Sequence, residues 1–473
     1  MPDALFDVVV RNAQVATASD TFACDIGIRA GRIVQLGQHL ARGTGEYDAG
    51  GRVVTPGGVD AHCHLDQPME APARMADDFF SGSRSAACGG TTTVIPFAAQ
   101  AKGQSLLAAV ADYHARAEGR AVVDYAFHLI VSDPTPEVLS KELPQLIAQG
   151  YTSFKVYMTY DDMKLDDGQI LDVLEVARVH GALAMLHAEN ADCIEWLTRR
   201  LEAAGRTAPR YHAHARPMLV EREATHRAIA LAQLVDVPIL IVHVSGKDAV
   251  EQIRWARNHG LSVFAETCPQ YLFLTAEDLG IDDSYQGARC ICSPPPRDKQ
   301  NQQVIWDGLN DGLFTVFSSD HAPFRYDDPH GKKPHGEEAA FRHIPNGIPG
   351  LETRLPLLYS EGVLGGRITL QKFVELTATN PAKAYGLHPR KGTIAIGSDA
   401  DLVVWDHRDT VVRNANLHHA VDYTPYEGMA LKAWPALTLS RGDVVWDGQS
   451  FAGQAGRGKF LRCGKPSLLP QRA

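Results

Sequence analysis

Residues 152–160 read TSFKVYMTY, and this stretch has the pattern of a strand that is buried on both faces. Phe154, Val156 and Met158 belong to an almost uninterrupted apolar run, as found in parallel sheets that are covered by helices. Lys155 lies among them, although a buried ammonium group without a partner is costly. The stretch therefore predicts a core strand whose lysine has a specific task.

The same texture recurs along the chain. Seven further apolar runs lie at 52–64, 91–99, 122–131, 182–190, 238–245, 261–269 and 314–323. Helical patterns separate most of them, for example at 166–181 and 247–260, where Asp lies near the start and Gly at the end, as in capped helices. Eight buried strands that alternate with helices predict an α/β fold, a (β/α)8 TIM barrel, over residues 54–387.

Both ends of the chain have a different pattern. Residues 6–18, 25–37, 391–406 and 436–448 alternate apolar and polar side chains between turn residues, as half-exposed antiparallel strands do. Neither group completes a sheet alone, so the two ends are expected to meet in a small β-sandwich domain, built from residues 1–53 and 388–450. Residues 451–473 are rich in Gly and basic, which predicts an extended C-terminal tail.

Charge and composition restrict the class of partner. The 46 Lys and Arg against 56 Asp and Glu give a formal charge of −10, which argues against nucleic-acid or polybasic membrane binding. Asp3 and Asp7 lie where a signal peptide would be basic, and no apolar segment is long enough for a membrane helix. The eight scattered cysteines indicate reduced thiols. We expect a cytoplasmic protein with a small substrate.

Side chains that bind metals lie at the carboxyl ends of five predicted strands, where barrel enzymes place their active sites. These residues are His62, His64, Lys155, His187, His243 and Asp320. Each of them alone is a weak signal, because single strand histidines are usually core residues. Their joint occurrence at equivalent strand ends predicts a metal site, and four imidazoles with one carboxylate suit Zn²⁺.

One ion needs only three or four of these ligands, so a second ion is expected, and two ions about 3.5–4 Å apart need a bridge. An apolar strand lowers the pKa of an amine and favours its neutral form. A neutral Lys155 can add carbon dioxide to become a carbamate, whose two oxygens can each bind one metal. The nearby histidines favour this carbamate over the alternative, an ion pair with a neighbouring carboxylate.

A set of motifs resembles one known family. In order they are TPGGVDAHCHLD, SFKVYMTY, LHAEN, IVHVS, ETCPQYL, CSPPPR, SDHAPF and IPNGIPGLE. They resemble the hydantoinase/dihydropyrimidinase family of cyclic amidohydrolases, in the amidohydrolase superfamily, and the resemblance extends from about Asp7 to Leu461. It implies a binuclear metal hydrolase, most often a homotetramer. Such an enzyme opens the cyclic amide ring of 5-substituted hydantoins or dihydropyrimidines to N-carbamoyl amino acids.

The resemblance also implies a role for each site residue. Carboxylated Lys155 would bridge two divalent ions, with Zn²⁺ expected. His62, His64 and Asp320 would hold the more buried ion. His187 and His243 would hold the other ion. Tyr160 would stabilise the oxyanion, Ser293 and Asn346 would present backbone groups to the substrate ring, and Asp320 would carry a proton to the leaving nitrogen.

Four alternatives are compared with the residues of this chain. Dihydroorotases usually carry Arg at the position of Asp66 to bind a substrate carboxylate, so Asp66 argues against an acidic substrate there. ETCPQYL is also similar to allantoinases, so an allantoinase-like ureide hydrolase stays open, although Tyr160 favours a hydantoinase. A non-catalytic dihydropyrimidinase-related scaffold protein would have lost metal ligands, and none is missing here. A single-metal deaminase would need a catalytic Glu, for which Glu189 is a weak candidate.

Overall fold

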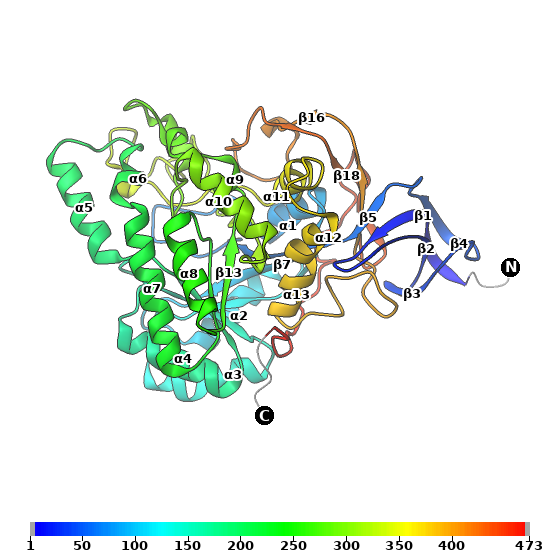
Figure 1. The fold of residues 1–473 in the computed structure, drawn as a ribbon, viewed down its shortest axis with the longest axis horizontal. Helices are drawn as coiled ribbons and strands as arrows, with labels where there is room; N and C mark the ends of the chain where they lie inside the picture. The colour runs from blue at the N-terminus through cyan, green and yellow to red at the C-terminus, as the bar shows by residue number, and fades with distance from the viewer. Residues whose placement is uncertain (1–4, 469–473) are drawn as a thin grey trace.

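The computed structural model describes residues 5–468, which form a barrel and, beside it, a sheet made from both ends of the chain (Figure 1). The barrel strands are β6 (Gly58–Cys63), β7 (Thr91–Ala99), β8 (Asp124–Tyr125), β9 (His128–Ile130), β10 (Ser153–Tyr157), β11 (Leu183–His187), β12 (Ile239–Ile241), β13 (Val263–Thr267) and β14 (Val316–Phe317). They pair in parallel in the order β14-β13-β12-β11-β10-β9-β7-β6, with β8 beside β7. A parallel bridge between Cys63 and His321 joins the two edges. The predicted (β/α)8 fold is confirmed.

Two of the predicted runs are divided in the structure. The run at 122–131 holds both β8 and β9. The run at 52–64 changes sheet at Gly57, because β5 (Val53–Pro56) pairs with strands of the terminal sheet while β6 enters the barrel. At Gly57 a Cβ atom would lie 2.1 Å from Thr92 Oγ1, so only glycine fits this crossing point.

The helices pack mainly around the outside of the barrel (Figure 1). They are α1 (Phe79–Cys88), α2 (Leu106–Ala117), α3 (Leu143–Ala148), α4 (Asp167–His180), α5 (Ala191–Ala203), α6 (Tyr211–Ala215), α7 (Met218–Val235), α8 (Lys247–Asn258), α9 (Gln270–Phe273), α10 (Lys299–Asn310), α11 (Arg354–Leu357), α12 (Leu370–Val374) and α13 (Asn380–Ala384). Within residues 5–468, no helix combines the length and the apolarity that a membrane crossing requires.

The terminal strands join into one hydrogen-bonded path. They are β1 (Phe6–Ala16), β2 (Thr21–Arg29), β3 (Arg32–Gly37), β4 (Gly43–Asp48), β5, β15 (Leu402–Asp406), β18 (Trp434–Ser440) and β19 (Asp443–Trp446). The order is β19-β18-β15-β5-β1-β2-β3, with β4 beside β1, and the antiparallel pair β5–β15 joins the two ends of the chain. The short strands β16 (Thr410–Val411) and β17 (Ala430–Leu431) form a separate hairpin. The domain limits at 53/54, 387/388 and 450/451 stay predictions.

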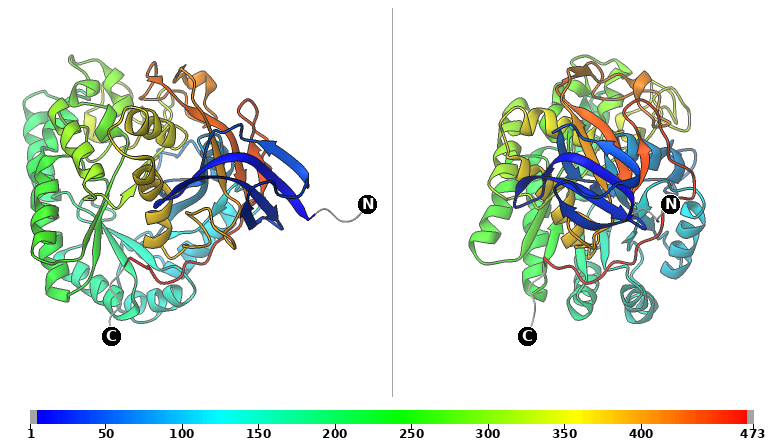
Figure 2. Two further views of the ribbon diagram at one scale, coloured as in Figure 1. Left: turned by 45° about the vertical axis from the view of Figure 1, so that its right-hand side comes forward. Right: turned by 90° about the vertical axis from the view of Figure 1, so that its right-hand side faces the viewer.

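The last part of the described chain runs along the barrel (Figure 2). Leu461 N–H donates to Tyr125 O at 2.7 Å, and Cys463 N–H donates to Gly150 O at 3.0 Å. The side chains of Leu461 and Cys463 are buried in the same apolar cluster as Val59, near the start of β6. This segment therefore covers the amino ends of the barrel strands, opposite the end where the predicted site residues lie.

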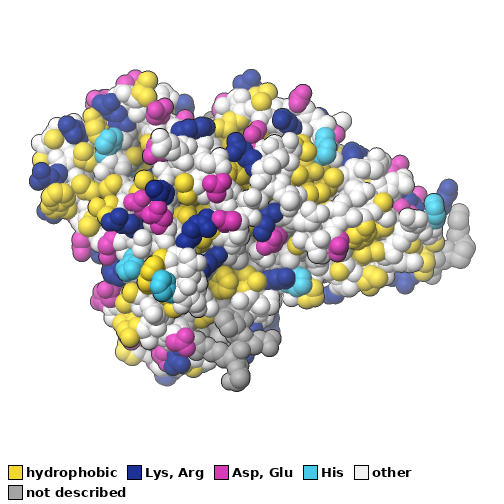
Figure 3. All heavy atoms as spheres, viewed as in Figure 1, with side chains coloured by type: hydrophobic (Ala, Val, Ile, Leu, Met, Phe, Trp, Pro, Cys, Tyr) yellow, Lys and Arg dark blue, Asp and Glu magenta, His cyan; other side chains and the backbone are white. Residues whose placement is uncertain are grey.

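Charged side chains of both signs are interspersed on the face of the molecule shown in Figure 3. On this face the acidic side chains are not gathered in one patch.

Candidate active site

The structure brings all six predicted metal ligands together at the carboxyl ends of the barrel strands. Three distances describe the first half of the cluster. His62 Nε2 lies 2.9 Å from Lys155 Nζ and 3.1 Å from Asp320 Oδ1, and His64 Nε2 lies 3.5 Å from the same carboxylate oxygen. All four side chains are buried. Ligand atoms of His62, His64 and Asp320 lie within 4.8 Å of one another, a spacing that one metal ion can bridge.

The other two histidines complete the cluster. His187 ends β11, and His243 follows β12 by two residues. His187 Nδ1 and His243 Nε2 are 3.0 Å apart, and the ring centroids of His243 and His62 are 5.4 Å apart. The two halves of the cluster therefore face each other across the top of the barrel.

Backbone strain gathers at this site. Tyr160, His243 and Asp320 have φ values of 69°, 38° and 49°, in the left-handed region that is uncommon for residues other than glycine, although Asp and His adopt it more often than most. Such residues persist only where the surrounding structure holds them, and they are frequent at functional sites. The strain was not visible in the sequence, because none of the three positions carries the glycine that normally indicates this conformation.

Three of the four histidines are oriented by partners on the nitrogen that faces away from the cluster. The pairs are His62 Nδ1 with Glu266 Oε2 at 2.9 Å, His64 Nδ1 with Gln67 Oε1 at 2.7 Å and His187 Nε2 with Glu189 Oε2 at 2.8 Å. Each partner fixes the ring and the tautomer, so that the other nitrogen is free to bind a metal. The sequence prediction missed Glu266 and Gln67, and it considered Glu189 only as a base; the position of Glu189 two residues after His187 was the available signal.

Lys155 has the environment that a reactive amine needs. Its side chain is 1% exposed, and its Nζ lies 4.7 Å from the centre of the Phe97 ring and 4.8 Å from that of Tyr157. Burial lowers the pKa of Lys155 to about 8, against the opposing influence of Asp320 and Glu266. Among the described residues, the amine forms no ion pair within 4.0 Å, so the alternative of a paired lysine is not observed.

The carboxylate and the phenol of the site are held in opposite protonation states. Burial would raise the pKa of Asp320, but His62 and His64 hold it well below its usual range. Burial raises the pKa of Tyr160 to about 12, although Arg216 acts in the opposite direction. At neutral pH Asp320 is therefore ionised and able to accept a proton, while the Tyr160 hydroxyl keeps its proton and can donate it in a hydrogen bond.

The predicted substrate residues line one wall beside the cluster. Asn346 Nδ2 lies 3.5 Å from Tyr160 Oη, and Ser293 Oγ lies 3.5 Å from His212 Nε2. The segments that carry Ser293 and Asn346 are joined by a hydrogen bond from Gly347 N–H to Ile291 O at 3.0 Å. The structure thus places both segments on the same side as Tyr160.

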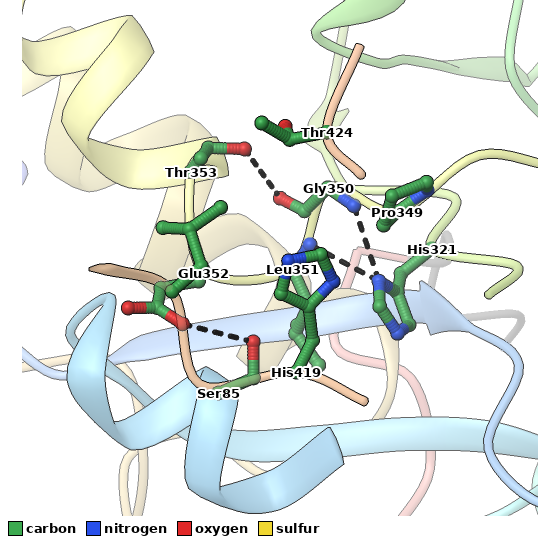
Figure 4. A pocket seen from close by; sticks show the side chains of 10 residues that line it. Ser85, His321, Pro349, Gly350, Leu351, Glu352, Thr353, His419 and Thr424 are labelled. Atoms are coloured by element: carbon green, nitrogen blue, oxygen red, sulfur yellow. Dashed lines mark hydrogen bonds between the residues drawn. The ribbon is translucent and has the colours of Figure 1, made fainter. Parts of the chain in front are cut away.

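The segment that carries Asp320 is supported from behind, beside a small cavity (Figure 4). His321 Nδ1 accepts hydrogen bonds from Gly350 N–H at 3.1 Å and Leu351 N–H at 3.4 Å, and its Nε2 lies 3.1 Å from Asp77 Oδ2. The side chain next to Asp320 is therefore fixed on both ring nitrogens, which orients the strand end.

Cys88, Glu352 and His418 form a second group of metal-ligand types, also within 4.8 Å. The Glu352 carboxylate accepts a hydrogen bond from His418 N–H at 2.8 Å and contacts His418 Nδ1 at 2.9 Å. These contacts occupy both carboxylate oxygens. The three residues therefore have a structural role, which is to hold the segment at His418 in place.

A parallel barrel that carries four imidazoles, a buried lysine of lowered pKa and a carboxylate at its strand ends defines a metal-dependent hydrolase class. Residues 53–445 match the Amidohydrolase family, and the chain belongs to that family. It is 44% identical to the D-hydantoinase of Ralstonia pickettii, over 96% of this chain and 98% of that protein. It is also 44% identical to the D-hydantoinase of Geobacillus stearothermophilus, over 98% and 97%.

Solved structures agree with this assignment. The crystal structure of dihydropyrimidinase from Brevibacillus agri NCHU1002 superposes with a TM-score of 0.93 at 42% identity, covering 97% of this chain and 98% of that one. L-Hydantoinase (dihydropyrimidinase) from Arthrobacter aurescens superposes with a TM-score of 0.86 at 31% identity, covering 97% and 100%. The barrel and the terminal sheet are therefore common to these proteins.

Proposed function

We propose that this protein hydrolyses the cyclic amide ring of 5-substituted hydantoins or dihydropyrimidines to give N-carbamoyl amino acids. The observation that carries the proposal is the buried amine of Lys155, 2.9 Å from His62 Nε2 and without a carboxylate partner among the described residues, inside a complete set of metal ligands. Relatives that are named D-hydantoinase and D-phenylhydantoinase, at 40–44% identity over nearly the whole chain, support the ring class.

The donor set fits two divalent ions, with Zn²⁺ proposed. One ion would be held by His62, His64 and Asp320, the other by His187 and His243. Lys155, carboxylated by carbon dioxide, would provide an oxygen to each. His187 Nδ1 and His243 Nε2 face each other at 3.0 Å, and this supports the division. When bound, such ions supply Lewis-acid polarisation and a water molecule of lowered pKa.

The chain itself supplies positioning and proton transfer. The Tyr160 hydroxyl, protonated at neutral pH, would donate a hydrogen bond to the carbonyl oxygen as negative charge develops on it. Ionised Asp320 would take a proton from the attacking water on its carboxylate and pass it to the leaving ring nitrogen. Backbone groups of Ser293 and Asn346 would hold the remaining polar edge of the ring, because both residues lie beside Tyr160.

The proposal also covers the cellular location, the oligomeric state and the size of the substrate. The family resemblance supports a cytoplasmic homotetramer with a small cyclic amide substrate, and the formal charge of −10 argues against a nucleic-acid partner. The allantoinase-like activity and the non-catalytic scaffold are outcomes of the same experiment.

The experiment compares the wild type with Lys155→Ala, and with Lys141→Ala as a control whose exposed amine pairs with Glu137. Metal content and the rates of opening of dihydrouracil, 5-phenylhydantoin, allantoin and dihydroorotate are measured. We expect the wild type and the control to bind two metal ions and to open the first two rings, and Lys155→Ala to lose metal and at least ~100-fold in rate.

Each other outcome contradicts one part of the proposal. Full metal content and full activity in Lys155→Ala would remove the bridging role of the lysine. If only allantoin were opened, the substrate class would be that of an allantoinase-like ureide hydrolase, and the proposed metal site would be unaffected. A wild type that binds metal but opens none of the four rings would favour the scaffold.

A further inference from the structure

The long segment between Ser293 and Asn346 contains a buried lysine that the catalytic proposal does not use. Lys332 has an exposed fraction of 0%, although its neighbours in the loop, including Lys333, are more exposed. A buried amine of this kind must find acceptors, because an unsatisfied donor in the interior is costly. The partners of Lys332 therefore indicate what it does.

Lys332 Nζ donates to Pro345 O at 2.6 Å and to Ile291 O at 3.0 Å. Pro345 directly precedes Asn346, and Ile291 lies two residues before Ser293. One amine therefore joins the two segments that hold the proposed substrate contacts. Within residues 5–468 it forms no ion pair with a carboxylate, so its contacts are those to the backbone and to the Phe324 ring, 5.6 Å away.

Other contacts hold the lysine itself in place. Lys332 N–H donates to Arg325 O at 2.8 Å, and the Tyr285 hydroxyl donates to Lys332 O. At Gly331 a Cβ atom would lie 2.0 Å from Arg325 O, so the loop approaches the backbone closely just before the lysine. The backbone contacts with Arg325 and Tyr285 thus hold Lys332 where its amine reaches the two carbonyl oxygens.

We infer that Lys332 is a positioning residue that cross-links the two substrate-binding segments and sets the spacing between Ser293 and Asn346. This inference rests on the proposed function, because only that function places these segments at the substrate. It deepens the proposal by assigning a task to a residue that is not among the predicted metal ligands. Burial lowers the pKa of Lys332 to about 7, yet a neutral amine still has two N–H donors, so the cross-link survives deprotonation.

The test uses Lys332→Met, which keeps the length of the side chain and removes its donors. Lys333→Met is the matched control, because Lys333 is the next residue, is paired with Asp327 at 2.9 Å and Glu337 at 2.6 Å, and contacts neither carbonyl. Both variants are compared with the wild type in KM and kcat for 5-phenylhydantoin and dihydrouracil. Metal content and backbone amide exchange followed by mass spectrometry complete the comparison.

For Lys332→Met we expect KM to rise about tenfold and kcat to change less than about threefold, because loosened segments weaken ground-state and transition-state binding alike. The amide of Gly347, which donates to Ile291 O, should exchange faster, while metal content stays that of the wild type. The control should match the wild type in every measurement.

Wild-type KM together with wild-type exchange at Gly347 in folded Lys332→Met would overturn the inference. If Lys332→Met does not fold, Lys332→Gln, whose shorter side chain cannot span both carbonyls, is measured in its place with the same expected and contrary results. Amide exchange needs no substrate, so a wild type without ring-opening activity would refute the proposed function while the cross-link was still tested.

Discussion

At the scale of single residues, the site depends on burial, which shifts the pKa values of Lys155 and Tyr160. Lys155 is unusual already in the sequence, and the structure shows it 1% exposed with its amine 2.9 Å from His62 Nε2. The type and order of the six ligands were readable from the sequence because strand ends of a barrel converge. Glu266 and Gln67 were not, because their role depends on which nitrogen of each histidine faces outwards.

Tyr160→Phe should lower kcat about 100-fold and leave the metal content unchanged, because it removes a hydrogen bond that strengthens as the oxyanion forms. Burial raises the pKa of Tyr160 to about 12, so the donor remains protonated below that pH. The rate of the wild type should therefore show no loss through Tyr160 ionisation between neutral pH and about pH 11.

Steady-state kinetics across that pH range provide the measurement. Tyr211→Phe is the control, since its hydroxyl accepts a hydrogen bond from Arg210 at 2.9 Å, away from the cluster. Wild-type kcat in Tyr160→Phe would rule out the proposed hydrogen bond to the oxyanion.

At the scale of elements, local signals predicted one helix well and another incompletely. Asp166 caps α4 through Gln169 N–H at 2.8 Å, and Gly181 ends it with φ 67°, as the sequence pattern suggested. Helix α8 was also expected to begin at an Asp, but its N-cap is Gly246 and the first amide is satisfied by Asn301 from α10 at 2.8 Å. That cap lies 54 residues further along the chain and could not be recognised from local pattern.

Asp166→Ala should destabilise the first turn of α4 by about 1 kcal/mol, because it removes one half of a reciprocal capping box. Amide exchange in residues 167–170 should become faster, while exchange in the last turn changes little. Asp172→Ala, at an exposed position inside the same helix, is the control. Equal exchange in the two variants would show that the cap contributes nothing to α4.

At the scale of the whole molecule, a buried ion cluster joins the barrel to the terminal sheet. Lys391 Nζ lies 2.7 Å from Asp124 of β8, 3.1 Å from Asp399 and 2.6 Å from Asp401, and Arg441 lies 3.1 Å from Asp124. These groups come from three distant parts of the chain. The cluster is therefore a consequence of tertiary closure.

Lys391→Met should cost about 3–5 kcal/mol, because it leaves buried carboxylates without their main cation. Lys391 and Arg441 together hold the pKa of Asp124 below its usual value in spite of burial. A carboxyl group with a lowered folded-state pKa stabilises the fold above its unfolded pKa, and this contribution is lost as the pH falls through the folded value.

The measurement is the Tm of the wild type and of Lys391→Met between about pH 4 and pH 8, a range that includes the titration of aspartates whose pKa is shifted. The variant should melt at a lower temperature near neutral pH, and its difference from the wild type should shrink towards pH 4, because protonation of Asp124 removes the buried charge that has lost its strongest partner. Lys141→Met, which removes an exposed amine, should follow the wild type. Identical curves for all three proteins would exclude a stabilising role of the cluster.

The sequence by itself determined the class of the fold, the meeting of the two ends of the chain in one β-domain and the residue types of the site. These features follow from periodicity and turn residues within short segments, which local physics encodes directly. The tertiary structure alone decided the sheet change at Gly57, the left-handed backbone of Tyr160, His243 and Asp320, and the cross-link made by Lys332. Each of these features depends on contacts between residues that come together only when the barrel closes. Such contacts cannot be read from the local pattern of the sequence.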